Sequence, residues 1–260
     1  MGQRGTDRDA FRTLVQAVTT AADAVLVLLL APGCAACDEL LDHPTRGPVC
    51  APCWQSILPL TPPLCDRCGD PLPTWRAVSV PALLCARCRR TPRFVDRARA
   101  VGAYDGALRA IVHAFKYDGR RSLARPLAAL MRERGASLLA DAACVVPVPL
   151  HPSRRRLRGF NQAVDLAGQL GPPLRPVLER VRATATQTGL PAAQRHRNVR
   201  DAFAVSRRFE SMLSGLTVVL VDDVCTTGAT LESCARALKG AGVGEVRALT
   251  AARVVTPPHA

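Results

Sequence analysis

The clearest hydrophobic pattern in the chain is a β-branched apolar run that ends in two adjacent acids. Residues 218–221 are all Val or Leu, which is typical of a parallel strand covered on both faces. Asp222 and Asp223 follow at the carboxyl end of that strand, where open α/β sheets bind their ligands. Apolar residues then recur at helical spacing over 231–238. The pattern predicts a buried strand, a loop and a helix in one unit.

The same reasoning predicts further elements of an α/β sheet upstream. Residues 99–104 are predicted to form an entering strand, and 106–117 a helix with one apolar face. A central strand is predicted over 143–149, ended by its prolines, and a helix is predicted to open at 159–162. Near the N-terminus, apolar residues at helical spacing over 14–25 predict an amphipathic helix that packs on the α/β domain or on a partner.

The loop after the two acids has the composition of a phosphate cradle. It supplies three hydroxyls, bare backbone N–H groups and a glycine at the start of a helix, where anions are attracted. A ligand with its ribose at the acids and its 5′-phosphate in the loop suits both halves. No lysine follows the glycine, so this is not a Walker loop. The alternative is a helix cap beside a surface acid pair. The loop residues are Thr226, Thr227, Gly228, Ala229 and Thr230.

Eight of the eleven cysteines form four Cys-x-x-Cys pairs between residues 34 and 88. Each pair places two thiolates on a tight turn, and two such turns complete a tetrahedral zinc site. We expect two structural zinc ribbons with sequential pairing, while a cross-braced arrangement or one degraded site stays open. A closed set of four thiolates leaves no position for catalysis. The expected ligands are Cys34, Cys37, Cys50 and Cys53 for one site and Cys65, Cys68, Cys85 and Cys88 for the other.

Length and charge add domain boundaries and a class of partner. The 260 residues are enough for an α/β domain and a smaller module. We expect an N-terminal helix in 1–32, a double zinc ribbon in 33–93 and the α/β domain in 94–260. The formal net charge of +14 points to anionic partners, although part of it is expected to be solvated surface. The apolar run at 24–31 is too short to span a bilayer, so we expect a cytoplasmic protein without a membrane span.

The acidic loop resembles the signature with which type I phosphoribosyltransferases bind phosphoribosyl pyrophosphate (PRPP), and the wider chain resembles the ComF family of competence-associated proteins. The resemblance extends from Cys34 to Arg253, and several motifs occur in the family's order. They are His113-Ala-Phe-Lys-Tyr-Asp-Gly119, Pro147-Val-Pro-Leu-His151, Arg158-Gly-Phe-Asn-Gln162 and the series Thr184, Gln187, Leu190, Arg195, Asn198, Ala202 and Phe203. The resemblance implies a type I phosphoribosyltransferase-like parallel sheet flanked by helices.

The resemblance also implies a chemistry, which is transfer of a phosphoribosyl group from PRPP and Mg²⁺ to an unknown nitrogen acceptor. Asp222 and Asp223 would hold the ribose, and Arg158 would take the charge of the departing pyrophosphate. Residues 179–203 would form a hood over PRPP, or else an ordinary surface loop. The further binding positions implied are Lys116, Asn161 and Gln162, of which Lys116 has a helix-terminal role as its alternative.

Two functions of different classes stay open. The retained acids and loop favour an enzyme, whereas zinc ribbons and basic charge favour a non-catalytic PRPP- or single-stranded-DNA-binding accessory protein in DNA uptake. Residues 154–156 are all arginine and are the leading candidates for a nucleic-acid contact. The low aromatic content of 4% argues against a base-stacking platform. Cys225 is expected to be a packing residue, because no histidine is fixed beside it.

Overall fold

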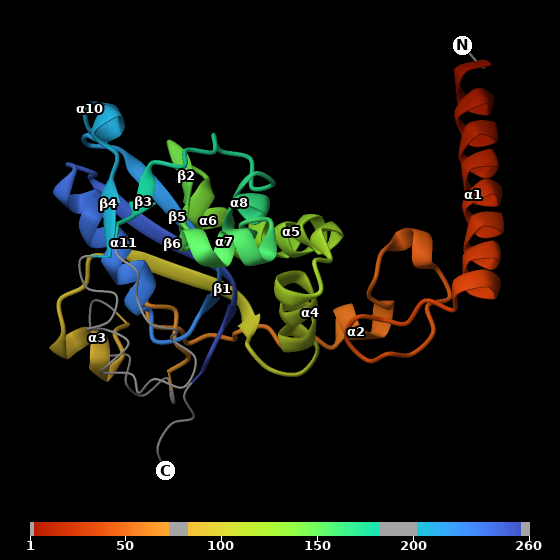
Figure 1. The fold of residues 1–260 in the computed structure, drawn as a ribbon, viewed down its shortest axis with the longest axis horizontal. Coiled ribbons are helices and arrows are strands. Elements are labelled where there is room, and N and C mark those ends of the chain that lie inside the picture. The colour runs from red at the N-terminus through yellow and green to blue at the C-terminus, as the bar shows by residue number, and fades with distance from the viewer. Residues whose placement is uncertain (1–2, 73–82, 182–201, 256–260) are drawn as a thin grey trace.

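The centre of the molecule is a parallel sheet of four strands in the order β1–β6–β5–β2 (Figure 1). A computed structural model defines the fold for residues 3–72, 83–181 and 202–255. β5 pairs with β6 along its length, but its pairing with β2 ends at Val221. The acids at 222 and 223 therefore lie beyond the last β2 pair, beside an open part of the β5 edge. The strands are β1 (Arg97–Ala103), β2 (Cys144–Pro147), β5 (Thr217–Cys225) and β6 (Glu245–Arg253).

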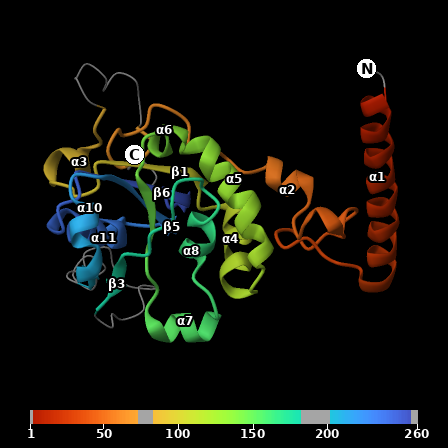
Figure 2. The ribbon, with the colours of Figure 1, turned by 90° about the horizontal axis from the view of Figure 1, so that it is seen from above.

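Helices cover both faces of this sheet (Figure 2). One core cluster joins α4, α5 and α8 to the face that carries Val219, and the other joins α11 to the face that carries Leu220. Successive residues of β5 thus enter opposite cores, as the two-residue period of a strand requires. The α/β fold predicted from the sequence is confirmed. The helices of this domain are α4 (Gly106–Tyr117), α5 (Ala124–Arg134), α6 (Ala136–Leu139), α7 (Pro152–Arg158), α8 (Gln162–Ala167), α10 (Glu210–Leu213) and α11 (Ala229–Gly240), with 3₁₀ turns η3 (Arg121–Leu123) and η4 (Arg207–Phe209).

Two features of the α/β domain differ from the sequence prediction. β2 is an edge strand of the described sheet and not a central one, and residues 173–175 cover its free side through the bond from Val145 N to Pro173 O at 2.9 Å. With its free side covered in this way, β2 is buried like a central strand, and its sequence is therefore as apolar as that of a central strand. The arginine-rich segment after β2 forms the helix α7. Its signals are local: Pro152 begins the helix, and Gly159 ends it with a positive φ of 74°.

The first half of the Cys-rich segment packs on α4, and the second half lies beside β1, where Arg99 donates to Asp66 O at 3.2 Å. The segment contains η1 (Pro44–Arg46) and the short helices α2 (Ala51–Gln55) and α3 (Ala86–Arg90). Between its two halves, Leu58 O accepts a hydrogen bond from Ala103 N at 3.3 Å, and Pro59 forms a bridge with Gly102. A Cβ on Gly102 would lie 2.5 Å from Leu58 O, so only glycine permits this approach. The linker thus protects the free edge of β1.

The N-terminal helix α1 (Gln3–Leu30) stands away from the sheet in both views (Figures 1 and 2). It lies against η1, where Asp23 is 5% exposed and accepts hydrogen bonds from Thr45 N at 2.8 Å and His43 Nδ1 at 3.2 Å. Of the two expectations for this helix, packing on the α/β domain is not found in the described residues, and packing on a partner stays a prediction. The apolar stretch is longer than the run at 24–31: residues 9–30 are long and apolar enough to cross a membrane by length and composition, a test that signal sequences and core helices also pass. The expectation of no membrane span therefore stays a prediction.

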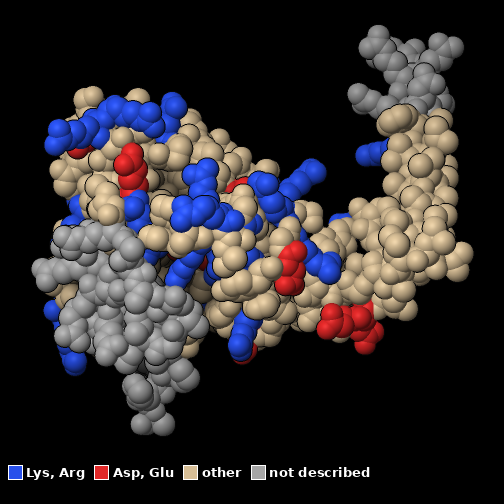
Figure 3. All heavy atoms as spheres, in the orientation of Figure 1, with Lys and Arg blue, Asp and Glu red and all other residues tan. Residues whose placement is uncertain are grey.

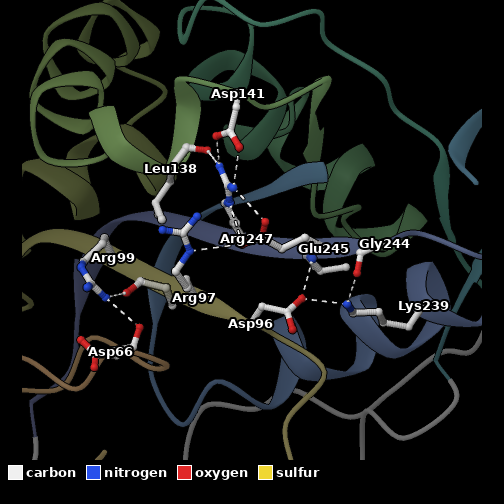
Figure 4. A network of polar contacts seen from close by, with 12 residues as sticks. Asp66, Asp96, Arg97, Arg99, Leu138, Asp141, Lys239, Gly244, Glu245 and Arg247 are labelled. Carbon is white, nitrogen blue, oxygen red and sulfur yellow. Dashed lines mark hydrogen bonds and ion pairs between the residues drawn. The ribbon is translucent and has the colours of Figure 1, made fainter. Parts of the chain in front are cut away.

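A polar network fastens the end of the sheet opposite the two acids (Figure 4). Arg247, 2% exposed, donates to both Asp141 and Glu245 and to Leu138 O at 3.0 Å. Lys239 at the end of α11 pairs with Asp96 at 2.8 Å. These bonds compensate the burial of the Arg247 charge and hold α6 and α11 to the starts of β1 and β6.

Candidate functional site

A cavity of about 350 Å³ opens at the carboxyl end of β5. The end of β5, the loop into α11, the end of α4 and one side of α7 form its walls. The two acids and the loop share this cavity, as the sequence pattern requires of a sugar-phosphate site. Eight of the positions predicted from the sequence line it, namely Lys116, Arg158, Asp222, Asp223, Thr226, Gly228, Ala229 and Thr230.

The two acids occupy different electrostatic environments. Asp223 is 7% exposed, and its Oδ1 lies 2.8 Å from Nζ of Lys116. Asp222 is half-buried and accepts the N–H of Asp223 at 2.9 Å. Burial and the neighbouring Asp223 raise the pKa of Asp222 to about 7, and Lys116 opposes that rise only in part. The pair thus combines a lysine-bound acid with one that titrates near neutrality.

Lys116 is the cation that balances this wall of the cavity. Burial disfavours its charge, but the carboxylates of Asp223 and Asp222 outweigh burial and raise the pKa of Lys116. A lysine near the end of α4 also complements the helix dipole. Its contact with Asp223 shows that it faces the acids as well, so both roles considered for Lys116 are compatible with its position.

The loop after β5 turns into α11 at Gly228. This glycine has φ 79° and forms the N-cap, a backbone conformation that L side chains rarely adopt. The backbone N–H groups at the start of the 12-residue helix lie beside the cavity with Ala229 and Thr230. A helix N-terminus with bare N–H groups is a site for an anion such as a phosphate.

Arginines form the wall opposite the acids. Arg158 stacks on Tyr117, with its guanidinium carbon 4.8 Å from the ring centre, and Arg154 lies on the same side of α7. Arg180 lines the cavity from β3 (Leu178–Arg180), where burial, and secondarily the nearby Arg154, lower its pKa. Planar guanidinium groups that converge in this way suit a pyrophosphate.

Three predicted positions do not line the cavity in the described structure. Thr227 Oγ1 accepts the N–H of Ala229 at 3.4 Å, which leaves it as a local cap. Asn161 caps α8 by accepting the N–H of Ala163 at 3.0 Å, and it donates to Val148 O at 3.1 Å. Gln162 is 1% exposed, and neither of its side-chain polar atoms has a hydrogen-bond partner. Ligand contacts by these residues therefore stay predictions.

Sequence reasoning missed Arg180, Tyr104 and Tyr117 as cavity residues. The only signal for Arg180 was its place at the start of segment 179–203, which was predicted to form a hood over PRPP or a surface loop, without a role for this arginine. The predicted hood lies outside the described residues over 182–201. Its two ends pair as β3 and β4 (Phe203–Val205), with Leu178 opposite Val205.

Cys225 lies in the wall between the loop and the zinc ribbon. Burial raises the pKa of its thiol, although Arg253 opposes that effect by donating to Sγ at 3.2 Å. A buried thiol with a raised pKa is a poor nucleophile. The arrangement therefore supports the packing role predicted for Cys225.

The eight paired cysteines converge in two sets of four. In each set the four Sγ atoms lie within 4.8 Å of one another. Cys37 and Cys50 are 3.8 Å apart and Cys68 and Cys85 are 3.7 Å apart, which fits the edge of about 3.8 Å expected for a tetrahedron with zinc–sulfur bonds of about 2.3 Å. Cys34 Sγ also accepts the N–H of Cys50 at 3.3 Å, as a thiolate does. The sets match the sequential pairing, and they fit structural zinc. They are Cys34, Cys37, Cys50 and Cys53, and Cys65, Cys68, Cys85 and Cys88.

Comparison with known proteins agrees with this two-part architecture. Residues 25–89 match the double zinc ribbon domain family, and residues 157–256 match the phosphoribosyl transferase domain family. The protein is therefore a phosphoribosyltransferase-fold protein with an N-terminal double zinc ribbon.

The relatives identify the family more narrowly. Competence protein F of Haemophilus influenzae is 31% identical over 81% of this chain and 93% of its own length. DNA utilization protein YhgH of Salmonella typhimurium is 36% identical over 76% of this chain and 87% of its own. Competence protein ComFC of Bacillus subtilis is 27% identical over 73% and 77%. The chain belongs to the ComF family.

Among solved structures, a glutamine PRPP amidotransferase from B. subtilis, complexed with ADP and GMP, matches 53% of this chain and 30% of its own. The sequence identity is 22% and the TM-score is 0.33. A likeness of that extent bears on neither the site nor its ligand.

Proposed function

We propose that this protein binds PRPP with Mg²⁺ in the cavity at the end of β5 and transfers its phosphoribosyl group to a nitrogen acceptor. The observation that supports this most is the convergence of Asp222, Asp223 and the Gly228 turn on one cavity, with arginines opposite. In this arrangement the ribose lies between the acids, its 5′-phosphate lies at the start of α11 and its pyrophosphate points toward Arg158. Each wall of the cavity then contacts the group of the ligand that it suits.

Mg²⁺ fits this site because proteins usually hold it by one or two carboxylates together with substrate phosphates. Asp222 and Asp223 are the carboxylates available for that purpose. The ion would neutralise charge on the leaving pyrophosphate. The protein's own part is to orient the ribose and to place cations where charge develops, so that no protein nucleophile is needed. The free thiols and thiolate zinc sets suit the reducing cytoplasm, which we propose as the location.

Calorimetric titration of PRPP with Mg²⁺ into wild type and Asp223→Asn tests the ligand. We expect the variant to bind about ten- to hundredfold more weakly, because an acceptor of the ribose hydroxyls loses its charge. Asp118→Asn is the matched control, since Asp118 is an exposed acid two residues after Lys116 and does not line the cavity. A wild type that does not bind PRPP refutes the proposal, and equal binding by Asp223→Asn excludes a ribose role for that acid.

Release of labelled pyrophosphate tests catalysis separately. We expect release from PRPP only when an acceptor amine or nucleobase is present, and a loss of at least about a hundredfold in Arg158→Ala, whose charge would stabilise the leaving group. Arg155→Ala is the matched control in the same helix, because Arg155 does not line this cavity. PRPP binding without pyrophosphate release for any amine or nucleobase would leave a binding protein and not an enzyme.

A second candidate function is binding of single-stranded DNA, as the words "DNA utilization" and "competence" in the relatives' names suggest. The observation that favours it is the exposure of Arg155 and Arg156 on α7. Figure 3 shows basic side chains gathered over the part of the molecule where α7 lies. Arginines on an exposed helix can neutralise phosphates without reading sequence.

Fluorescence anisotropy with a labelled oligonucleotide at several salt concentrations tests this candidate. Removing both arginines, in Arg155→Ala/Arg156→Ala, should reduce the slope of log K against log salt by about 1.4, or about 0.7 per phosphate contact. Arg125→Ala/Arg134→Ala on α5 removes the same charge elsewhere and should leave the slope unchanged. An equal reduction of the slope in both double variants would show that DNA binding depends on net charge alone and not on α7.

A further inference from the structure

The second zinc ribbon touches the phosphate loop directly. Arg87 lies on α3 between the zinc-ligand positions Cys85 and Cys88. Its Nη1 donates a hydrogen bond to the backbone oxygen of Thr227 at 3.3 Å, and its Nη2 donates to Asp70 Oδ2 at 3.0 Å. One guanidinium group therefore joins a metal-binding turn to the loop at the end of β5.

The bond to Thr227 O determines which way the next peptide group faces. In a trans peptide the carbonyl oxygen and the N–H of the following residue point in opposite directions. Gly228 lines the cavity on one side and the small ribbon–loop interface on the other, so this peptide is part of the wall between them. Because Arg87 holds the carbonyl of Thr227 on the ribbon side, the N–H of Gly228 is directed toward the cavity.

Two further ties hold the loop from the ribbon side. Asp70 also binds Arg253, and Arg253 Nη1 donates to Cys225 Sγ at 3.2 Å, just before the loop. After the loop, Glu232 in the first turn of α11 accepts Arg93 Nη1 at 3.1 Å and the N–H of Phe94 at 2.8 Å. The residues on both sides of Gly228 are thus fixed by contacts that lie outside the cavity.

The position of Arg87 depends on the metal site that surrounds it. The described core of this ribbon consists of the zinc-ligand positions with Leu72 and Leu84 packed against them. So small a cluster cannot order the turn by hydrophobic burial alone, and metal coordination would supply the folding free energy. The first ribbon packs instead on α4, and its linker reaches β1 at Gly102; among the described residues it makes no hydrogen bond to the phosphate loop.

We propose that Arg87 is a positioning residue for the phosphate loop, and that the second zinc site and the sugar-phosphate site are therefore energetically coupled. This rests on the proposed function, in that the ligand of the loop is a 5′-phosphate. Coupling between two sites is reciprocal: zinc at the second ribbon increases the affinity for the sugar phosphate, and the sugar phosphate retains that zinc. Zinc at the first site does not change the affinity for the sugar phosphate.

The first experiment measures binding of ribose 5-phosphate to the zinc-loaded full-length protein by calorimetry. Arg87→Ala should weaken binding about tenfold, the effect of one lost hydrogen bond to the loop. Arg87→Lys should weaken it less, because lysine can still reach one of the two partners. Arg89→Ala is the matched control, since Arg89 is an exposed arginine of the same helix with no side-chain bond to the loop. Unchanged binding in Arg87→Ala overturns the proposal.

The second experiment follows zinc release to a colorimetric chelator, which does not depend on catalysis. Ribose 5-phosphate should slow the release of one zinc ion by about tenfold and leave the other unaffected. In Cys37→Ser, which lacks a ligand of the first site, the protected ion should remain. In Arg87→Ala the protection should be lost. Protection of both ions, or of neither by a ligand that binds the wild type, refutes the coupling. Absence of ribose 5-phosphate binding to the wild type refutes the proposed function instead, and this inference with it.

Discussion

Replacement of Asp222 by asparagine tests the electrostatics of the cavity directly. Folding raises the pKa of this acid from 3.8 to about 7, with burial as the largest cause and Asp223 as the second. Between these two values the folded protein binds a proton that the unfolded chain has released. Stability from this group is therefore fully present below pH 4 and is lost as the pH rises through 7.

The magnitude follows from the size of the shift. One pH unit between 4 and 7 costs about 1.4 kcal/mol for a single group, so the full loss is at most about 4 kcal/mol. Asp222 is only half-buried, and solvent screening reduces this to about 2 kcal/mol. Asparagine keeps an oxygen that can accept the N–H of Asp223, now at 2.9 Å, but carries no charge. The variant without ligand should therefore be more stable than the wild type above pH 7.

Thermal unfolding at pH 5 and pH 8 measures this effect. Because about 1 kcal/mol corresponds to about 2–4 °C for a domain of this size, the advantage of Asp222→Asn should grow by several degrees between the two values. Any loss of zinc at low pH affects both proteins, so the difference between them is the quantity to compare. With PRPP bound, the wild type should be more stable than Asp222→Asn, since the ionised acid is proposed to hold the ribose. An advantage that stays constant from pH 5 to pH 8 would show that the pKa of Asp222 is not raised.

Three further changes test other parts of the structure. Lys116→Met removes the ion-pair partner of Asp223 and should cost about 3 kcal/mol at pH 8 but less at pH 5 in urea denaturation; an equal cost at both would contradict the ion pairing. Gly102→Ala places a Cβ 2.5 Å from Leu58 O and should lower the free energy of unfolding by about 1–3 kcal/mol, whereas Gly240→Ala, with open space around it, should be tolerated. Native mass spectrometry should find two zinc ions in the wild type and one in Cys37→Ser, and two in the variant would refute the four-cysteine sets.

Much of the fold could be predicted because its signals are local. The helix at 106–117 has the bounds that its apolar spacing predicts, and the run at 218–221 is buried on both faces. The Cys-x-x-Cys spacing led to the two cysteine sets for the same reason, since two thiols on one turn need no distant partner. The helix α7 was not predicted although Pro152 and Gly159 mark its ends, because it has no buried residues and therefore no apolar face that would give a helical period.

The sequence by itself determined the main helices and strands, the Cys-x-x-Cys turns and the presence of two acids before a glycine turn, because each depends on residues a few positions apart. Only the tertiary structure decided which groups meet. Lys116 faces Asp223 across more than a hundred residues, and Arg180 arrives from a separate two-stranded sheet. The contact of Arg87 with Thr227 spans 140 residues. Such contacts, and the burial that makes Asp222 differ from Asp223, arise when the layers pack, and no local pattern in the chain encodes them.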